Sequence, residues 1–192
     1  MTTRNRWIAA AVALLVALAG YFVSSQKHAR IDRLSRDCAT IARRKDWPRL
    51  EELAREWTAL ESSPLAWFWL GSALKEQQEW SEAEEAFSHV PVDGLRGIDA
   101  AIARMEIVYH IDQRPLAAIE LARDLLQRDA GLAAPRRHLI HFYAMTMQRP
   151  ELTREIRLAI KHRADVPEHY LYLFSVEDLS FRDAEQVTAR WV

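Results

Sequence analysis

The sequence predicts an all-α protein in which helical hairpins follow one another behind an apolar N-terminal helix. The chain of 192 residues contains only five glycines, and its seven prolines fall mostly where one segment gives way to the next. Helical segments recur at a nearly constant interval, which is typical of stacked repeats. In front of them lies an uncharged stretch from Trp7 to Val23.

The composition narrows the classes of function. Hydrophobic residues make up 49% and charged residues 28% of the chain, so a packed core is expected and disorder is not. The formal net charge of -1 gives no reason to expect a nucleic acid. Cys38 is the single cysteine, which excludes a disulfide within the chain. Glycine-rich nucleotide loops and nucleophile motifs are missing from the sequence, so we predict a non-enzymatic protein without a cofactor or metal.

Residues 1–25 are predicted to form a membrane anchor. A helix over residues 7–23 would come close to crossing the hydrocarbon core of a bilayer, which takes about 20 residues. A cleaved signal peptide is the alternative, because residues 17–19 read Ala-Leu-Ala, an A-x-A type of cleavage site. The apolar run continues past that site to Val23, which favours the anchor.

Basic residues flank this stretch on both sides. Arg4 and Arg6 precede it, and four more Lys or Arg follow it closely, which by direct counting would keep the large domain in the cytoplasm. Moving the short basic tail across the membrane is costly, however, and long domains translocate largely regardless of charge. We therefore expect a single-pass inner-membrane protein with its soluble domain outside the cytoplasm.

The remainder of the chain is self-similar. The second helices of the predicted hairpins begin at Pro48, Ser81, Pro115 and Pro150. Successive starts are 33, 34 and 35 residues apart. Proline suits a first helical position because the backbone N–H that it lacks has no partner there. The preceding first helices are expected over residues 31–44, 65–77, 100–111 and 136–147.

These pairs predict one repeat domain over residues 26–192. Its units would cover residues 31–63, 64–97, 99–133 and 134–165, with a partial unit over 166–192. In the partial unit, the stretch FRDAEQVTARWV is expected to be the second helix of a fifth pair.

The most regular unit contains the stretch WFWLGSALKEQQEWSEAEEAF, from Trp67 to Phe87. We expect its two helices to approach closely at Gly71 and Ala83, with Trp67 and Phe87 filling the space beside these small residues. Glycine within a helix costs about 1 kcal/mol relative to alanine, and the apolar burial that close approach permits would offset that cost. The residues that define this unit are Trp67, Leu70, Gly71, Leu74, Ala83 and Phe87.

This stretch resembles the tetratricopeptide repeat family, whose two-helix unit of about 34 residues carries Trp-x-x-Leu-Gly-x-x-Tyr followed by Ala-x-x-x-Phe. Leu74 stands where tyrosine is commonest, and the neighbouring units are degenerate, with Thr153 and Arg157 replacing Ala and Phe in the fourth. The resemblance implies a right-handed solenoid whose ligands meet the first helices on a concave face. By position it implies a peptide-binding groove at Phe68, Ser72, Lys75, Ile107, His110, His138, Phe142 and Met145.

The resemblance therefore implies a scaffold or adaptor that binds a protein or peptide. The chain looks like bacterial envelope proteins with one anchor and a repeat domain, so an envelope assembly factor is the expected role. One alternative is a structural subunit that self-associates through the C-terminal end near Trp191. Another is a metal-dependent or enzyme accessory domain using His110, His138 and His141, although the spacing of a metalloprotease motif does not accompany them.

Overall fold

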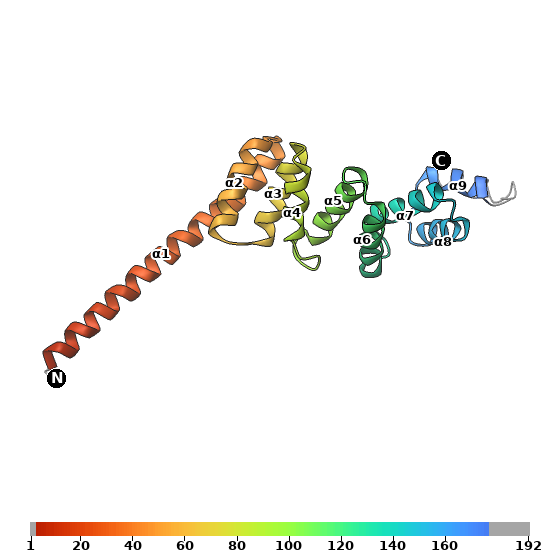
Figure 1. Cartoon of the computed structure of the whole chain (residues 1–192). Helices are drawn as coiled ribbons and strands as arrows, with labels where there is room; N and C mark the ends of the chain where they lie inside the picture. The colour runs from red at the N-terminus through yellow and green to blue at the C-terminus, as the bar shows by residue number, and fades with distance from the viewer. Residues whose placement is uncertain (1–2, 177–192) are drawn as a thin grey trace. The chain divides into compact units, whose positions relative to one another are not determined.

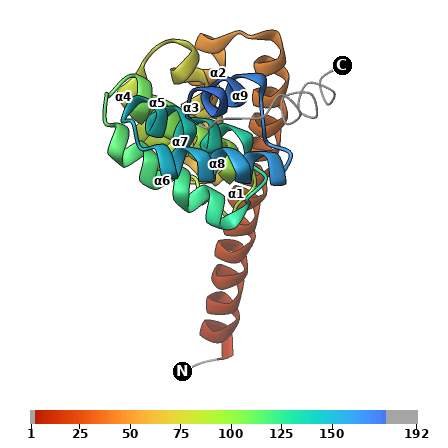
Figure 2. The same cartoon turned by 90° about the vertical axis from the view of Figure 1, so that its right-hand side faces the viewer.

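The computed structural model describes residues 3–176, and within them the side chains outside residues 3–17, 19–20, 23 and 175–176. Every regular element in this part of the chain is an α-helix (Figures 1 and 2). The chain divides into two compact units, Met1–Pro91 and Val92–Val192, each with internal packing of its own. The prediction of an all-α fold is confirmed.

The helices fall into hairpins. The first unit contains α1 (Thr3–Arg44), α2 (Trp47–Leu60), α3 (Pro64–Glu76) and α4 (Trp80–Ser88). The second contains α5 (Gly97–His110), α6 (Pro115–Arg128), α7 (Ala133–Met145), α8 (Arg149–Lys161) and α9 (Pro167–Val176). The second helices α2, α4, α6 and α8 each begin at the predicted residue or one residue before it.

The first unit is built on the faces that α1, α2 and α3 turn toward one another. Leu34 and Cys38 of α1 pack with Leu50 and Trp57 of α2, and none of the four is more than 3% exposed. Cys38 therefore acts as a small buried apolar residue. Its burial, with a smaller contribution from the neighbouring Asp37 charge, raises the pKa of the thiol to about 12. A thiol that keeps its proton is a poor nucleophile.

The predicted close approach at Gly71 is confirmed. The side chain that lies against this glycine is the ring of Phe87. A Cβ atom placed on Gly71 would lie 2.8 Å from both Cδ1 and Cε1 of the Phe87 ring. Ala83 is fully buried, as expected of a small residue in the hairpin. Trp67 differs from the prediction: it is half-buried and stacks on His89 at a centroid distance of 4.3 Å. Phe87 is thus the ring that fills the space beside the glycine.

The second unit has a larger core. Its centre is formed by Met105 and Val108 of α5, Ile119 of α6, Ile140 of α7 and Ile156 of α8, each at most 2% exposed. α9 adds the buried side chains Tyr170 and Leu173 to the same cluster. Within this unit each helix packs on the next along the chain, and α5 also contacts α7. The first helices α5 and α7 therefore lie side by side.

The turns between paired helices contain non-glycine residues in the left-handed backbone conformation. Gln78 between α3 and α4 has a φ of 67°, and the N–H of Glu79 donates to the Leu74 carbonyl at 2.9 Å. Met147 between α7 and α8 has a φ of 57°, and Gln148 N–H donates to the Tyr143 carbonyl at 2.9 Å. Such six-to-one hydrogen bonds behind a left-handed residue are the usual end of an α-helix, most often with glycine at that residue.

The N-terminal segment is part of one long helix. Residues 3–25 and the predicted first helix over 31–44 form the single element α1. No helix in the described part of the chain combines the length and the apolar content that a membrane crossing requires. The anchor predicted over residues 7–23 therefore finds no support in the described residues. The segment expected to complete a fifth pair, with Trp191, lies outside them.

Candidate functional site

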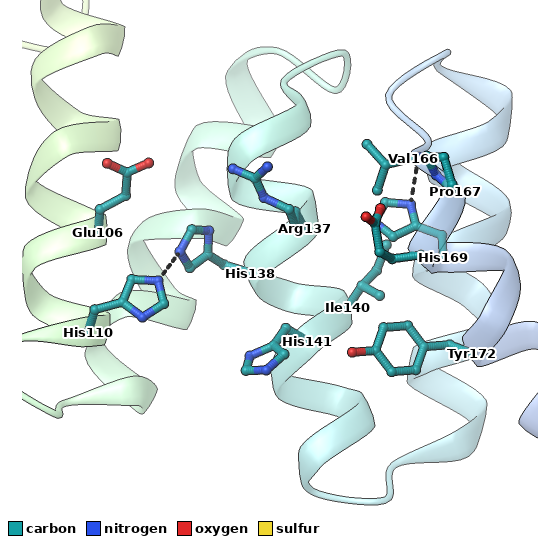
Figure 3. Close-up of a pocket in the computed structure, with 11 residues that line it drawn as sticks. Glu106, His110, Arg137, His138, Ile140, His141, Val166, Pro167, His169 and Tyr172 are labelled. Carbon is teal, nitrogen blue, oxygen red and sulfur yellow. Dashed lines mark hydrogen bonds between the residues drawn. The ribbon is translucent and has the colours of Figure 1, made fainter.

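A groove with a volume of about 690 Å³ lies in the second unit. Its walls come from α5, α7 and the segment that begins α9 (Figure 3). We call it the histidine groove. Its lining consists of Glu106, His110, Arg137, His138, Ile140, His141, Val166, Pro167, Glu168, His169 and Tyr172. The helices α5 and α7 are the first members of their pairs, so two walls of the groove come from the helices on which the sequence placed ligands.

Two histidines from neighbouring helices meet in this groove. His138 Nε2 of α7 lies 3.2 Å from His110 Nε2 of α5. His138 Nδ1 lies 2.9 Å from the Ala134 carbonyl, which can only accept, so Nδ1 carries the proton. Nε2 of the neutral His138 ring is then an acceptor, and His110 Nε2–H is the donor. Burial is the main cause of a lowered pKa at His138, which keeps that ring neutral.

Tyr109 makes a second contact between α5 and α7. Its hydroxyl lies 2.8 Å from Nδ1 of His141, and its ring meets the His138 ring edge to face at 5.1 Å. Burial, reinforced by Tyr172, raises the pKa of Tyr109, so the phenol keeps its proton and can donate it to His141 Nδ1. When the phenol donates, His141 carries its own proton on Nε2.

His169 at the start of α9 is the most buried histidine of the groove. It is 1% exposed, and its Nδ1 accepts from the backbone N–H of Val166 at 3.3 Å. The neutral ring therefore carries its proton on Nε2. Nε2 is buried and has no hydrogen-bond partner among the described residues. Burial is the main cause of a lowered pKa at His169, so the ring stays neutral rather than gaining charge.

Charged side chains border the histidines. Glu106 on α5 and Glu168 on α9 are acidic, and Arg137 on α7 is basic. The Glu106 carboxylate opposes the effect of burial on the pKa of His138, and Arg137 adds to that effect. Side chains of both signs therefore border the histidines.

The structure assembles only part of the predicted peptide site. His110 and His138 line the groove and contact each other. Ile107 is buried at 2% exposure, and Phe142 packs against the core cluster of the second unit. Met145, at the end of α7, is 71% exposed and is not among the groove residues.

The other three predicted residues belong to the first unit. Phe68 is 5% exposed and packs edge-on against Trp69 at 5.4 Å. Ser72 donates its hydroxyl to the Phe68 carbonyl at 2.8 Å, and Lys75 is half-buried. The resemblance to the repeat family placed Phe68 on the ligand face by its position in the unit. Its ring instead turns toward Phe87, at 6.2 Å, within the hairpin.

The structure does not gather the three histidines of the alternative metal site around one point. His110 pairs with His138, whereas His141 bonds to Tyr109. In the part of the chain that the structure describes, no group of three or more His, Cys, Asp or Glu side chains is arranged to hold a metal ion.

Several groove residues were missed by sequence reasoning. Arg137, His169 and Tyr172 follow no family pattern, and α9 had no predicted boundary. One signal was present: Arg137 and His141 are four residues apart, as are Glu106 and His110, and such pairs share a helix face. The spacing does not reveal how each helix is rotated relative to its neighbour, so it could not show that these faces meet.

Comparison with known proteins bears on the fold. No family model matches the chain, and no curated protein matches it either. A solved structure described as the MamA RS-1 ArsTM double mutant is similar at 16% identity, with a TM-score of 0.66, over 83% of this chain and 91% of that one. YrrB, described as a TPR protein with an unusual peptide-binding site, is similar at 12% identity, with a TM-score of 0.58, over 67% of this chain and 66% of that one. The chain therefore has the helical-repeat fold of tetratricopeptide proteins.

Proposed function

We propose that this protein is a non-catalytic adaptor that binds an extended segment of a partner protein in the histidine groove. The observation that carries the proposal is the position of the groove on the first helices α5 and α7 and on the neighbouring α9. Support also comes from YrrB, a protein of similar fold that is described as having a peptide-binding site. The groove offers aromatic and apolar contact surface from Tyr172 and Pro167 together with hydrogen-bonding rings, a combination suited to a peptide.

In-cell photocrosslinking tests this proposal. A photoreactive side chain at the exposed position 141 lies in the groove, whereas the same side chain at the exposed position 157 lies on α8 and outside the groove. We expect one partner segment to be captured from position 141 and not from position 157. A synthetic peptide of that segment should bind the purified chain, and a His141→Trp variant should weaken binding by obstructing the groove. Equal capture from both positions would contradict the proposal.

We also propose that residues 7–23 hold the protein at the inner membrane, with the repeat domain outside the cytoplasm as an assembly factor of the envelope. The support is the uncharged sequence of that stretch. Alkaline extraction should leave the chain in the membrane fraction, and a Leu15→Arg variant should move it to the soluble fraction. Protease added to spheroplasts should digest the domain. A protected domain would reverse the orientation, and a freely extracted chain would rule out the anchor.

Self-association is a second candidate function, favoured by the outer face of α9. Leu171 is 69% and Phe174 is 50% exposed, whereas Tyr170 and Leu173 on the opposite face are buried. Exposed apolar residues of this size are common at interfaces when they lie together. If copies associate here, a Leu171→Gln/Phe174→Gln variant should sediment as a monomer where the parent chain does not. An unchanged sedimentation coefficient would argue against this interface.

A further inference from the structure

The outer surface of α8 and of the turn that follows it is basic. The two carboxylates of this stretch contribute little to that surface, since Glu151 is half-buried and Glu155 is buried against Arg136 at 2.8 Å. Every exposed charged residue from position 149 to position 163 is an arginine or a lysine. We call these residues the basic face: Arg149, Arg154, Arg157, Lys161 and Arg163.

A cavity of about 450 Å³ adjoins α8 and adds to this positive charge. Its charged lining consists of Arg123 of α6, Arg136 of α7, and Arg154 and Glu155 of α8. Glu155, the one carboxylate in this lining, already pairs with Arg136. Guanidinium groups along a concave surface focus the positive potential there. The region around α8 therefore attracts carboxylates.

The end of α3 and the helix α4 have the opposite charge. From Glu76 to Ser88 the sequence contains five glutamates and neither lysine nor arginine. Four of the glutamates are exposed, and we call them the acidic face: Glu76, Glu79, Glu82 and Glu85. Glu82 pairs with Arg55 of α2 at 2.6 Å. The other three form no ion pair within residues 3–176, so their charges are available to a partner.

We propose that the basic face of one copy of this chain binds the acidic face of a second copy. The charges of the two faces are complementary in sign and similar in extent. Arg154 to Lys161 and Glu79 to Glu85 each cover about 10 Å at about 1.5 Å per residue. Because the contact joins two different surfaces, each copy keeps one unused face of each sign, and further copies can add. The inference is independent of the histidine groove and of the apolar face of α9.

The size of the two faces limits the strength of the contact. α8 has 13 residues and is about 20 Å long. A contact along one such helix buries less than the roughly 1,200 Å² that stable interfaces need. We therefore expect a weak and transient association that depends on charge.

Salt dependence gives the first test. The full chain is studied by sedimentation velocity in a nonionic detergent, which covers the apolar stretch at residues 7–23. We expect association at about 50 mM NaCl that weakens about tenfold at about 500 mM, because screening shortens the range of exposed charges from about 10 Å at 0.1 M to about 3 Å at 1 M. Association that persists in salt and is lost in the Leu171→Gln/Phe174→Gln variant would belong to α9 and would overturn the inference.

Charge reversal gives the sharper test. Arg154→Glu/Lys161→Glu disables the basic face, and Glu79→Lys/Glu85→Lys disables the acidic face. Each variant alone should associate at least about tenfold more weakly than the parent, since two attractive charges have become repulsive. A mixture of the two variants combines one intact basic face with one intact acidic face. The mixture should therefore form a one-to-one complex as tightly as two parent chains, without further growth.

Matched variants separate the contact from the net charge. Arg33→Glu/Arg44→Glu, at exposed positions on α1, lowers the net charge by the same four units as the change on α8, from -1 to -5. This control should associate as the parent does. Arg154→Gln/Lys161→Gln adds no repulsion and should weaken association by about threefold. All the replaced residues are exposed, so the variants should fold, and circular dichroism checks this.

Three outcomes overturn the inference. The first is a parent chain that stays monomeric at about 50 mM NaCl, and its adsorption to vesicles of anionic phospholipid would then assign the basic face to a membrane. The second is equal loss of association in the control on α1. The third is a mixture of the two reversed variants that does not associate. Position 157 lies on the basic face, so crosslinks from it to another copy of the chain support the contact and do not bear on the partner segment captured from position 141.

Discussion

Gly71 shows how one small residue determines the spacing of a hairpin. The Phe87 ring occupies the place where any larger residue would put its Cβ atom. Phe87 is only 3% exposed, so the ring has little room to withdraw. The helix-propensity cost of the glycine is therefore offset by a close ring contact that no other residue permits.

A Gly71→Ala variant should consequently be less stable. Overpacking a core costs about 1–3 kcal/mol, and the better helix propensity of alanine returns about 1 kcal/mol, so the net loss should be up to about 2 kcal/mol. Urea unfolding measures this loss. Adding Phe87→Leu should recover part of it, and Ser72→Ala, at the next residue, should change stability by less than about 0.5 kcal/mol. A Gly71→Ala chain as stable as the parent would contradict the close contact.

At the scale of elements, the turns between helices hold local strain. Lys45, Gln78, Gln113 and Met147 have φ values of 54–67°, and each lies in the turn between the two helices of a pair. Side chains with a Cβ atom adopt this conformation at a cost of about 1 kcal/mol, which glycine avoids. The packing of the paired helices imposes the turn whatever residue occupies it.

Replacing Gln78 by glycine should therefore stabilise the chain. The relief of strain of about 1 kcal/mol is reduced by the greater freedom of glycine in the unfolded state, so we expect a gain of about 0.5 kcal/mol or less. The midpoint of thermal unfolding should rise slightly. Gln77→Gly, one residue earlier and at a φ of -88°, should lower it. A fall in both variants would show that the turn at Gln78 is not strained.

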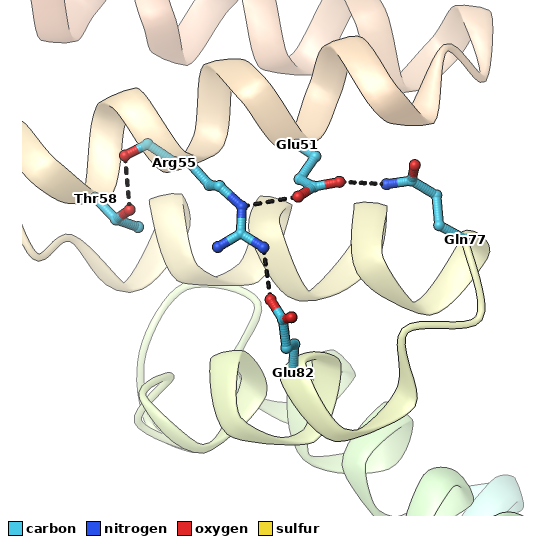
Figure 4. A network of polar contacts seen from close by, with 5 residues as sticks. All are labelled: Glu51, Arg55, Thr58, Gln77 and Glu82. Carbon is cyan, nitrogen blue, oxygen red and sulfur yellow. Dashed lines mark hydrogen bonds and ion pairs between the residues drawn. The ribbon is translucent and has the colours of Figure 1, made fainter.

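Polar contacts join helices in both units but differ in burial. In the first unit, Arg55 of α2 donates to Glu51 on its own helix at 2.7 Å and to Glu82 of α4 at 2.6 Å (Figure 4). The hydrogen bond from Arg55 is the main cause of a lowered pKa at Glu51. In the second unit, Arg136 of α7 and Glu155 of α8 form an ion pair at 2.8 Å with side chains 3% and 11% exposed.

Removing one partner of the buried pair should be costly. Glu155→Leu leaves Arg136 buried without its carboxylate and should cost about 3–5 kcal/mol, whereas Arg136→Met combined with Glu155→Leu should regain most of the loss. The matched exposed change, Glu82→Leu, should cost less than about 1 kcal/mol. A double-mutant cycle in urea measures these values. If Glu155→Leu and Glu82→Leu lower the free energy of unfolding by the same amount, burial does not distinguish the two ion pairs.

At the scale of the whole molecule, each of the two compact units contains a core cluster. Leu34, Cys38 and Trp57 belong to one cluster, and Met105, Ile140 and Ile156 belong to the other. In repeat proteins, stability is approximately a sum over units and their nearest neighbours, so a local defect spreads over a limited distance.

We therefore expect Gly71→Ala to act on one unit. Hydrogen exchange followed by mass spectrometry should show faster exchange in peptides from α2, α3 and α4, because local opening there becomes easier. Peptides from α6, α7 and α8 should exchange at the parent rate. Faster exchange throughout would mean that the two units unfold as a single cooperative body.

The helices and their pairing were determined by local chemistry, so the sequence alone predicted them. Prolines mark the starts of α6 and α8 within a residue because a first helical position tolerates the missing N–H. Gly71 likewise predicted a close approach of two helices, because a glycine within a helix is unfavourable unless a neighbour needs the space. Ser81 and Glu84 have the spacing of a capping box, but α4 begins at Trp80 with Glu79 as its N-cap and has no side-chain cap hydrogen bond.

The groove was decided only by the tertiary structure. His110 and His138 are 28 residues apart, and their 3.2 Å contact depends on how α7 is rotated against α5. Packing of the apolar faces sets that rotation, and it turned Phe68 and Ile107 into the core while leaving His110 at the surface. Periodicity identifies the residues that share a face of one helix. Contacts between helices that are distant in the sequence determine which faces meet. The same contacts determine which nitrogen of each histidine ring carries the proton.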